Sequence, residues 1–227
     1  MLVNTPQAVL FDLDGTLVDS VPGIHQALHQ ALSQHTGAGC SINDVRHWVG
    51  NGPHRLVQRG LTSVQGKAFT TELLDATLNT FNQGYAQCVY NGALYSGVAD
   101  GLWKLQQAGL RLACITNKPW PFTEPYLEHL GIAQHFDTVI CADQVTQPKP
   151  HPESLSLACT RFDIKPGQAV MVGDSVNDLA PALALEMPAI AVSYGYHQNE
   201  SLADQQPVLI ADSFADVLDA LLKRPAE

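Results

Sequence analysis

The sequence predicts an α/β protein with a doubly wound parallel sheet and a small helical domain inserted after the first strand. Three observations support this fold class. The apolar run Ala8–Phe11 has the length of a buried strand and ends abruptly in acidic residues. Residues 22 to 91 follow a helical hydrophobic pattern and contain no convincing strand. From Val98 onward, short apolar runs alternate with helical segments, which is typical of parallel sheets covered on both faces.

The expected domains follow from this order of elements. Because a single strand cannot bury itself, the first strand must join the sheet that the later strands form. We therefore expect residues 1–20 and 92–227 to form the α/β core, and residues 21–91 to form the helical domain. Within the core, strands are expected at residues 110–116, Thr138–Cys141, Ala169–Gly173, Ala189–Val192 and 208–210, and helices at Val98–Gln107 and 122–130.

The inserted segment is predicted to contain several helices. The first begins near Pro22, because proline is favoured in the first turn of a helix, and its apolar residues recur at helical spacing. A short helix around Leu56 is expected to end near Gly60, and a longer one to cover roughly residues 66 to 86. Between these helices, residues 50–53 (Gly-Asn-Gly-Pro) form a strong turn signal.

The composition limits the kinds of molecule that the protein is expected to bind. Twelve Lys and Arg against 22 Asp and Glu leave a formal charge of −10, which argues against nucleic acids and anionic membranes. The five cysteines are scattered and odd in number, as expected of buried thiols in a reducing compartment. The sequence shows neither a signal peptide nor an apolar run long enough to span a membrane. We therefore expect a cytoplasmic protein. A monomer and a homodimer are both open as its oligomeric state.

Two acidic residues, Asp12 and Asp14, stand at the end of the first strand, directly before Gly15. Alternation along the strand places both carboxylates on one side, while Leu13 points the other way. Unpaired carboxylates are costly to bury, so they need a cation, strong hydrogen-bond donors, or both. Two close carboxylates at a strand tip suit a hard divalent ion such as Mg²⁺.

Three further sets of polar residues are expected at the tips of strands later in the chain. Thr116 and Asn117 end an apolar run, and a threonine hydroxyl beside free backbone N–H groups suits phosphate oxygens. Lys149 stands between two prolines that stiffen its loop. Asp174 ends another buried strand, and a helix capped by Ser175 would bring Asp178 onto the face nearest it. Ligands in such sheets bind beyond the carboxyl ends of the strands, so these side chains should meet.

The order Asp-x-Asp-Gly-Thr, Thr-Asn, Lys and Gly-Asp-x-x-x-Asp resembles the signature of the haloacid-dehalogenase-like (HAD) phosphohydrolases over nearly the whole chain. The resemblance implies a Rossmann-like core with an inserted cap domain. It also implies that Asp12 is a nucleophile that forms an aspartyl-phosphate, and that Asp14 is a general acid and base. Dehalogenases and phosphonatases lack the second aspartate, so Asp14 favours a phosphate ester as substrate.

The same resemblance implies Mg²⁺ as the cofactor. The ion would be held by the Asp12 carboxylate, the backbone carbonyl of Asp14 and Asp174, with Asp178 contributing directly or through water. The phosphoryl oxygens would be held by Thr116, the Asn117 amide and Lys149, and Lys149 would also offset the charge of Asp12.

Substrate choice is expected to lie in the cap. Exposed backbone N–H groups and nearby arginines could bind a small carboxylate, although a solvated turn between helices is an equally good explanation. The candidates are Arg46, Gly50, Asn51, Gly52 and Arg55. His25 and His29 have the one-turn spacing of zinc ligands, but an ordinary helix face is favoured because the sequence shows no third ligand nearby.

Within the family, the sequence is most similar to the phosphoglycolate phosphatases, on residues 14–20, 45–52 and 95–98. The predicted function is therefore Mg²⁺-dependent hydrolysis of a small phosphomonoester, with 2-phosphoglycolate as the preferred substrate. A phosphomutase of the β-phosphoglucomutase kind shares all four motifs and stays open as an alternative, as do a pyrophosphatase and another sugar-phosphate phosphatase. A non-enzymatic binding module is disfavoured because no acidic residue of the motifs is missing.

Overall fold

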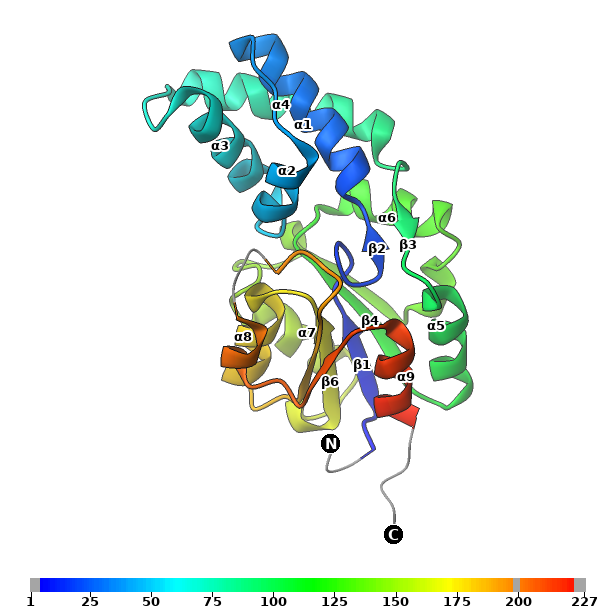
Figure 1. The fold of residues 1–227 in the computed structure, drawn as a ribbon. Helices are drawn as coiled ribbons and strands as arrows, with labels where there is room; N and C mark the ends of the chain where they lie inside the picture. Colours follow the sequence, from blue (N-terminus) through cyan, green and yellow to red (C-terminus); the bar gives the residue numbers. More distant parts are fainter. Residues whose placement is uncertain (1–4, 198–200, 223–227) are drawn as a thin grey trace. The chain divides into compact units, whose positions relative to one another are not determined.

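The structure, a computed structural model, describes residues 5–197 and 201–222. Its main element is a six-stranded sheet in the order β5-β4-β1-β6-β7-β8, in which all neighbouring strands are parallel (Figure 1). The strands are β1 (Ala8–Phe11), β4 (Arg111–Thr116), β5 (Thr138–Cys141), β6 (Ala169–Gly173), β7 (Ala189–Val192) and β8 (Leu209–Ala211). The strand nearest the N-terminus therefore lies in the middle of the sheet.

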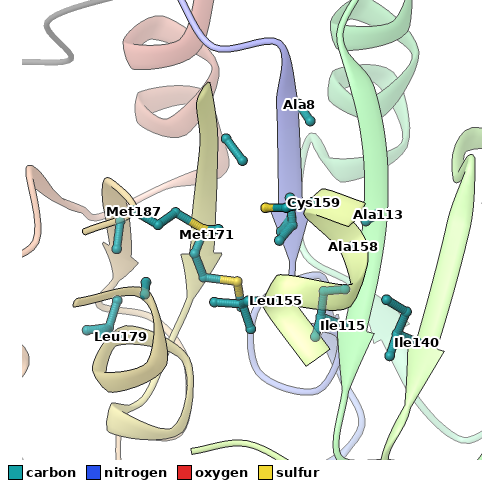
Figure 2. Packing of buried hydrophobic residues seen from close by; sticks show 14 of the residues in the cluster. Ala8, Ala113, Ile115, Ile140, Leu155, Ala158, Cys159, Met171, Leu179 and Met187 are labelled. Carbon is teal, nitrogen blue, oxygen red and sulfur yellow. The ribbon is translucent and has the colours of Figure 1, made fainter. Parts of the chain in front are cut away.

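Helices cover both faces of this sheet, so every residue of β1, β6 and β7 is buried. On one face, Leu10 of β1 belongs to a buried cluster with Met171 of β6 and with Leu155 and Leu179 from two helices. Figure 2 shows Met171, Leu155 and Leu179 in this cluster. On the other face, the Phe11 ring lies 6.0 Å from the ring of Phe214. The helices of this part are α5 (Val98–Gln107), α6 (Trp120–His129), α7 (Glu153–Arg161), α8 (Val176–Ala184) and α9 (Phe214–Leu222). The predicted doubly wound α/β fold is thus confirmed.

Short 3₁₀ helices connect several of these elements. They are η1 (Ala133–His135), η2 (Ala142–Gln144), η3 (Pro166–Gln168) and η4 (Leu202–Gln205).

The chain divides into two compact units, one comprising Met1–Asp19 and Leu94–Glu227 and the other Ser20–Ala93. The chain passes between them along β2 (Val18–Asp19) and β3 (Ala93–Leu94), which pair as a two-stranded ribbon. The described residues include no helix that combines the length and the apolar character needed to cross a bilayer. That the two units act as a catalytic core and a cap stays a prediction.

The second unit is made of helices α1 (Val21–Thr36), α2 (Ile42–Trp48), α3 (Gly52–Gln65) and α4 (Thr71–Cys88). Helices α1 and α4 approach closely where the Cys88 thiol donates to the Gly23 carbonyl, at 3.3 Å. A Cβ on Gly23 would lie 2.3 Å from the Cys88 carbonyl oxygen, so only glycine permits this approach. This contact between two backbones helps to hold α1 against α4.

One helix end in this unit differs from the prediction. Helix α3 does not stop near Gly60 but continues to Gln65, and Gly66 follows with φ of 75°. Gly60 is buried against α1, where an added Cβ would lie 3.0 Å from the nearest side-chain carbon of Leu32. The glycine therefore allows two helices to pack closely. The prediction that the helix ends near Gly60 is wrong.

Candidate active site

The strand register brings several predicted site residues to one edge of the sheet. Phe11, the last residue of β1, pairs with Cys114 of β4 and with Val172 of β6. The next residue, Asp12, donates its backbone N–H to the Val172 carbonyl at 2.9 Å. Asp12 and Asp174 consequently leave adjacent parallel strands at the same edge, where the sequence predicted a ligand site.

Lys149 joins Asp12 to Asp178 at this edge. Its ammonium nitrogen lies 2.7 Å from Asp12 Oδ1 and 2.6 Å from Asp178 Oδ1, and it also donates to the Ile115 carbonyl at 2.6 Å. All three ammonium donors thus have partners. The Lys149 backbone is fixed as well, because Asn117 Nδ2 donates to its carbonyl at 2.8 Å. The Asn117 side chain therefore positions the lysine loop in this structure.

Burial and charge shift the pKa values of this group. Burial is the main cause that raises the pKa of Asp12 from 3.8 to about 7; Lys149 opposes the shift, and the charges of Asp178 and Asp14 add to it. Burial alone would lower the pKa of Lys149, but the carboxylates of Asp12 and Asp178 outweigh it and raise that pKa. The lysine therefore remains an ammonium ion, and it is the group that favours ionised Asp12.

The Asp174 side chain lies very close to the backbone at two glycines. Thr16 Oγ1 donates to its Oδ1 at 3.3 Å, and the backbone N–H of Tyr196 donates to its Oδ2. A Cβ on Gly15, whose φ is 94°, would lie 2.2 Å from Asp174 Oδ2, and one on Gly195 would lie 2.3 Å from Asp174 Cβ. Both glycines are therefore needed for the backbone to approach this carboxylate.

The carboxylates of Asp12, Asp174 and Asp178 form a candidate metal site. All three side chains are buried, and each offers an oxygen within 4.8 Å of the others. Burial, followed by the charges of Asp12 and Asp178, raises the pKa of Asp174 well above its ordinary value. Such an excess of buried negative charge, with oxygen donors only, fits a hard divalent cation.

Asp178 also helps to position the ammonium group of Lys149. Its Oδ2 accepts hydrogen bonds from the Ser175 backbone N–H at 3.2 Å and from the Ser175 hydroxyl at 2.9 Å, while its Oδ1 faces Lys149. The first of these contacts belongs to the capping box that begins α8. The helix cap therefore fixes the carboxylate that orients the lysine.

Sequence reasoning missed the partner of Asp14. Lys118 Nζ lies 2.9 Å and 2.8 Å from the two carboxylate oxygens of Asp14, and it lies 5.4 Å from the centre of the Tyr126 ring. The lysine is buried and immediately follows the Thr116–Asn117 pair. A cation directly after the polar end of β4 was the signal that could have identified it. Thr116 is buried too, and its hydroxyl oxygen accepts the Lys118 backbone N–H at 3.1 Å.

The predicted cap residues lie together within the second unit. Gly50 and Gly52 have φ of 117° and 80°, so the turn that joins α2 to α3 requires glycine at both positions. Asn51 is the N-cap residue of α3, although its side chain makes no capping hydrogen bond. On either side, Arg46 lies in α2, and the exposed Arg55 donates to Gln58 Oε1 at 2.7 Å.

Comparison with known proteins settles the family. The sequence matches the model of the haloacid dehalogenase-like hydrolase family over residues 9–192. The chain belongs to this family. It is 39% identical over 232 residues to a phosphoglycolate phosphatase of Salmonella choleraesuis (strain SC-B67), and the aligned region covers 95% of this chain and 92% of the relative. It is 37% identical over 227 residues to a phosphoglycolate phosphatase of Colwellia psychrerythraea (strain 34H), covering 97% and 99%.

Solved structures agree with the assignment to the haloacid dehalogenase-like hydrolases. The crystal structure of a predicted phosphoglycolate phosphatase from Haemophilus somnus 129pt matches with a TM-score of 0.91 at 32% identity, covering 96% of this chain and 99% of that one. CbbY from Rhodobacter sphaeroides, solved in complex with phosphate, matches with a TM-score of 0.79 at 24% identity, covering 93% and 96%. The second likeness shows the shared fold.

Proposed function

We propose that this haloacid dehalogenase-like hydrolase is an Mg²⁺-dependent phosphatase that hydrolyses 2-phosphoglycolate to glycolate and phosphate. The proposal rests on one observation above all: two aspartates at the end of β1 are each paired with a buried lysine, Asp12 with Lys149 and Asp14 with Lys118. The names of the relatives at 39% and 37% identity support the substrate.

In the first half of the proposed reaction, a carboxylate oxygen of Asp12 attacks the phosphorus atom. The bond between phosphorus and the ester oxygen breaks, and Asp14 gives a proton to the departing glycolate oxygen. In the second half, Asp14 removes a proton from a water molecule that attacks the aspartyl-phosphate. The bond from phosphorus to Asp12 then breaks, which releases phosphate and restores the carboxylate.

The two lysines act on different aspartates in this scheme. Lys149 offsets the charge of Asp12, so that an anionic nucleophile can approach an anionic substrate. Lys118 holds the Asp14 carboxylate through both of its oxygens and thereby fixes the group that must face first the leaving oxygen and then water. Thr116, the Asn117 amide and Lys149 are the proposed ligands of the phosphoryl oxygens.

The proposed Mg²⁺ ligands are the Asp12 carboxylate, the Asp14 backbone carbonyl and Asp174, with Asp178 acting directly or through water. When bound, the ion supplies positive charge between the acidic cluster and the phosphate. The fit of this donor set rests on the three buried carboxylates, whose oxygens lie within 4.8 Å of one another.

The decisive test is single-turnover phosphate release from a panel of phosphorylated metabolites in excess Mg²⁺, with EDTA as the metal-removal control. We expect the highest kcat/KM with 2-phosphoglycolate and no release in EDTA. Asp12→Asn, a nearly isosteric change, should abolish release while circular dichroism shows a folded protein. Retained activity in this variant would refute the nucleophile. Isomerisation of a sugar phosphate without net release of phosphate would instead identify a mutase.

We further propose that the turn between α2 and α3 recognises the substrate carboxylate through Arg46, Gly50, Asn51, Gly52 and Arg55. The support is the positive-φ turn flanked by two arginines. Arg55→Met should raise KM for 2-phosphoglycolate and leave KM for p-nitrophenyl phosphate, which lacks a carboxylate, unchanged. Arg161→Met, at an exposed position outside this unit, is the matched control. Equal effects on both substrates would exclude carboxylate recognition by Arg55.

A further inference from the structure

A second cluster of metal-binding side chains lies in the helical unit. His25 and His29 stand one turn apart on α1, and Cys40 lies in the connection from α1 to α2. One ring nitrogen of each histidine and the Cys40 sulfur all lie within 4.8 Å of one another. The sequence showed no third ligand near the two histidines, and the fold brings Cys40 to this position.

Both imidazoles already converge on the same residue. His25 Nε2 lies 3.1 Å and His29 Nδ1 lies 2.9 Å from the Cys40 carbonyl oxygen, and the two ring centres are 5.5 Å apart. A carbonyl oxygen only accepts a hydrogen bond, so the ring nitrogen that faces it carries a proton, and a metal ion would be bound by the other nitrogen of each ring. Imidazole nitrogens are common metal ligands, and here two imidazole rings lie side by side.

Gly39 allows this convergence. A Cβ at this position would lie 2.2 Å from His29 Cε1 and 2.4 Å from His29 Nδ1. The backbone of Gly39 does not have a positive φ, so its conformation does not require glycine. The close approach of the His29 ring is therefore the reason that a side chain does not fit at this position. The loop backbone is therefore in direct contact with the imidazole, and it presents Cys40 beside both rings.

We propose that His25, His29 and Cys40 bind a borderline-soft divalent transition metal, with Zn²⁺ as the natural choice. Two imidazoles and a thiolate match the nitrogen and sulfur ligands of zinc, whereas Mg²⁺ requires oxygen. Cys40 binds as the thiolate, and its proton passes to solvent. Three protein ligands leave a fourth position for water. His29 is exposed and His25 is half-buried, so the ion enters from solvent.

A metal ion at this site would link α1 to the segment that leads into α2. The site differs in chemistry from the acidic cluster of the other unit, which offers carboxylates only. The two sites are therefore expected to select different metals. The zinc site does not rest on the proposed phosphatase activity.

The test uses Co²⁺ as a spectroscopic substitute for Zn²⁺, with the full-length reduced protein in saturating Mg²⁺. We expect one equivalent of Co²⁺ to produce a thiolate-to-cobalt charge-transfer band, which a carboxylate site cannot give, and Zn²⁺ to remove it by competition. Cys40→Ala should lose the band. His25→Gln and His29→Gln should each weaken binding by at least about tenfold, since even the loss of an outer partner of a metal ligand costs that much.

Two matched controls come from the same unit. Cys88→Ala removes another buried cysteine, and His47→Gln removes a histidine whose Nδ1 also faces a backbone carbonyl, that of Asn43. Both should keep the band. The proposal fails if the wild-type protein gives no thiolate band, or if Cys40→Ala and Cys88→Ala behave alike. His29→Gln changes an exposed side chain, so its result stands even if Cys40→Ala folds poorly.

Discussion

Replacing Lys149 by methionine should destabilise the protein strongly, because the ammonium ion is surrounded by buried acidic groups. Its side chain is only 2% exposed, and the partner carboxylates of Asp12 and Asp178 are 10% and 1% exposed. Removing one partner from a buried ion pair costs about 3–5 kcal/mol, because a charge is left without compensation. With two carboxylates affected, we expect a loss in the free energy of unfolding at the upper end of about 3–5 kcal/mol.

The loss should depend on pH with a defined sign. Burial raises the pKa of Asp12 from 3.8 to about 7 even with Lys149 present, and removing the ammonium raises it further. Above about pH 7, and up to the higher pKa of the variant, the folded variant therefore keeps a proton on Asp12 that the folded wild type has released. A group whose pKa is raised on folding stabilises the protein at low pH and loses that contribution as pH rises. The variant should consequently approach the stability of the wild type as pH falls from 8 to 5.

The assay is urea unfolding of the wild type and Lys149→Met at pH 5, 6, 7 and 8, in EDTA so that no metal replaces the missing charge. Lys104→Met, at an exposed lysine of α5, is the matched control and should change the free energy of unfolding by less than about 0.5 kcal/mol. A stable Lys149→Met variant, or a loss of stability that is the same at pH 5 and pH 8, would refute the electrostatic reasoning.

Three further predictions concern single positions. Lys118→Met should lower kcat by roughly 100-fold or more through misplacement of Asp14, while Lys104→Met keeps wild-type kcat; equal rates would show that the ion pair is dispensable. Gly15→Ala should lose activity and about 1–3 kcal/mol of stability, because its φ of 94° disfavours a side chain and the Cβ would meet Asp174; calorimetry and phosphate release measure both. Burial raises the pKa of the Cys114 and Cys159 thiols, so the native protein should react slowly with a disulfide reagent at pH 8 and rapidly in urea.

The sheet could be predicted from the sequence because each core strand is a short apolar run with a polar end. The predicted spans of the strands at Thr138–Cys141, Ala169–Gly173 and Ala189–Val192 are the observed ones. Parallel strands share one carboxyl edge, and this topological rule predicted that Asp12 and Asp174 would meet. The roles assigned to these residues stay predictions.

Other features depend on packing, which a single sequence does not display. The position of Lys118 directly after β4 placed it at the same edge of the sheet, but its pairing with Asp14 depends on the register of β1 and β4. The predicted helix end at Gly60 is wrong for a related reason. The sequence alone does not distinguish a glycine that permits close helix packing from one that ends a helix. Likewise, Cys40 became a candidate ligand only when the loop was folded against α1.

The central position of β1 has a consequence for biosynthesis. This strand is synthesised before the other strands of its sheet, yet its hydrogen-bonded neighbours are β4 and β6. Ala8 can therefore pair only after Arg111 on one side and Ala169 on the other have been synthesised. The four-helix unit, by contrast, is complete by Ala93, and its contacts are more local. Since distant pairings form slowly, the helical unit can acquire its structure during translation while β1 remains unpaired. The edge that carries Asp12 is then assembled only after the strand that precedes Asp174 has been synthesised.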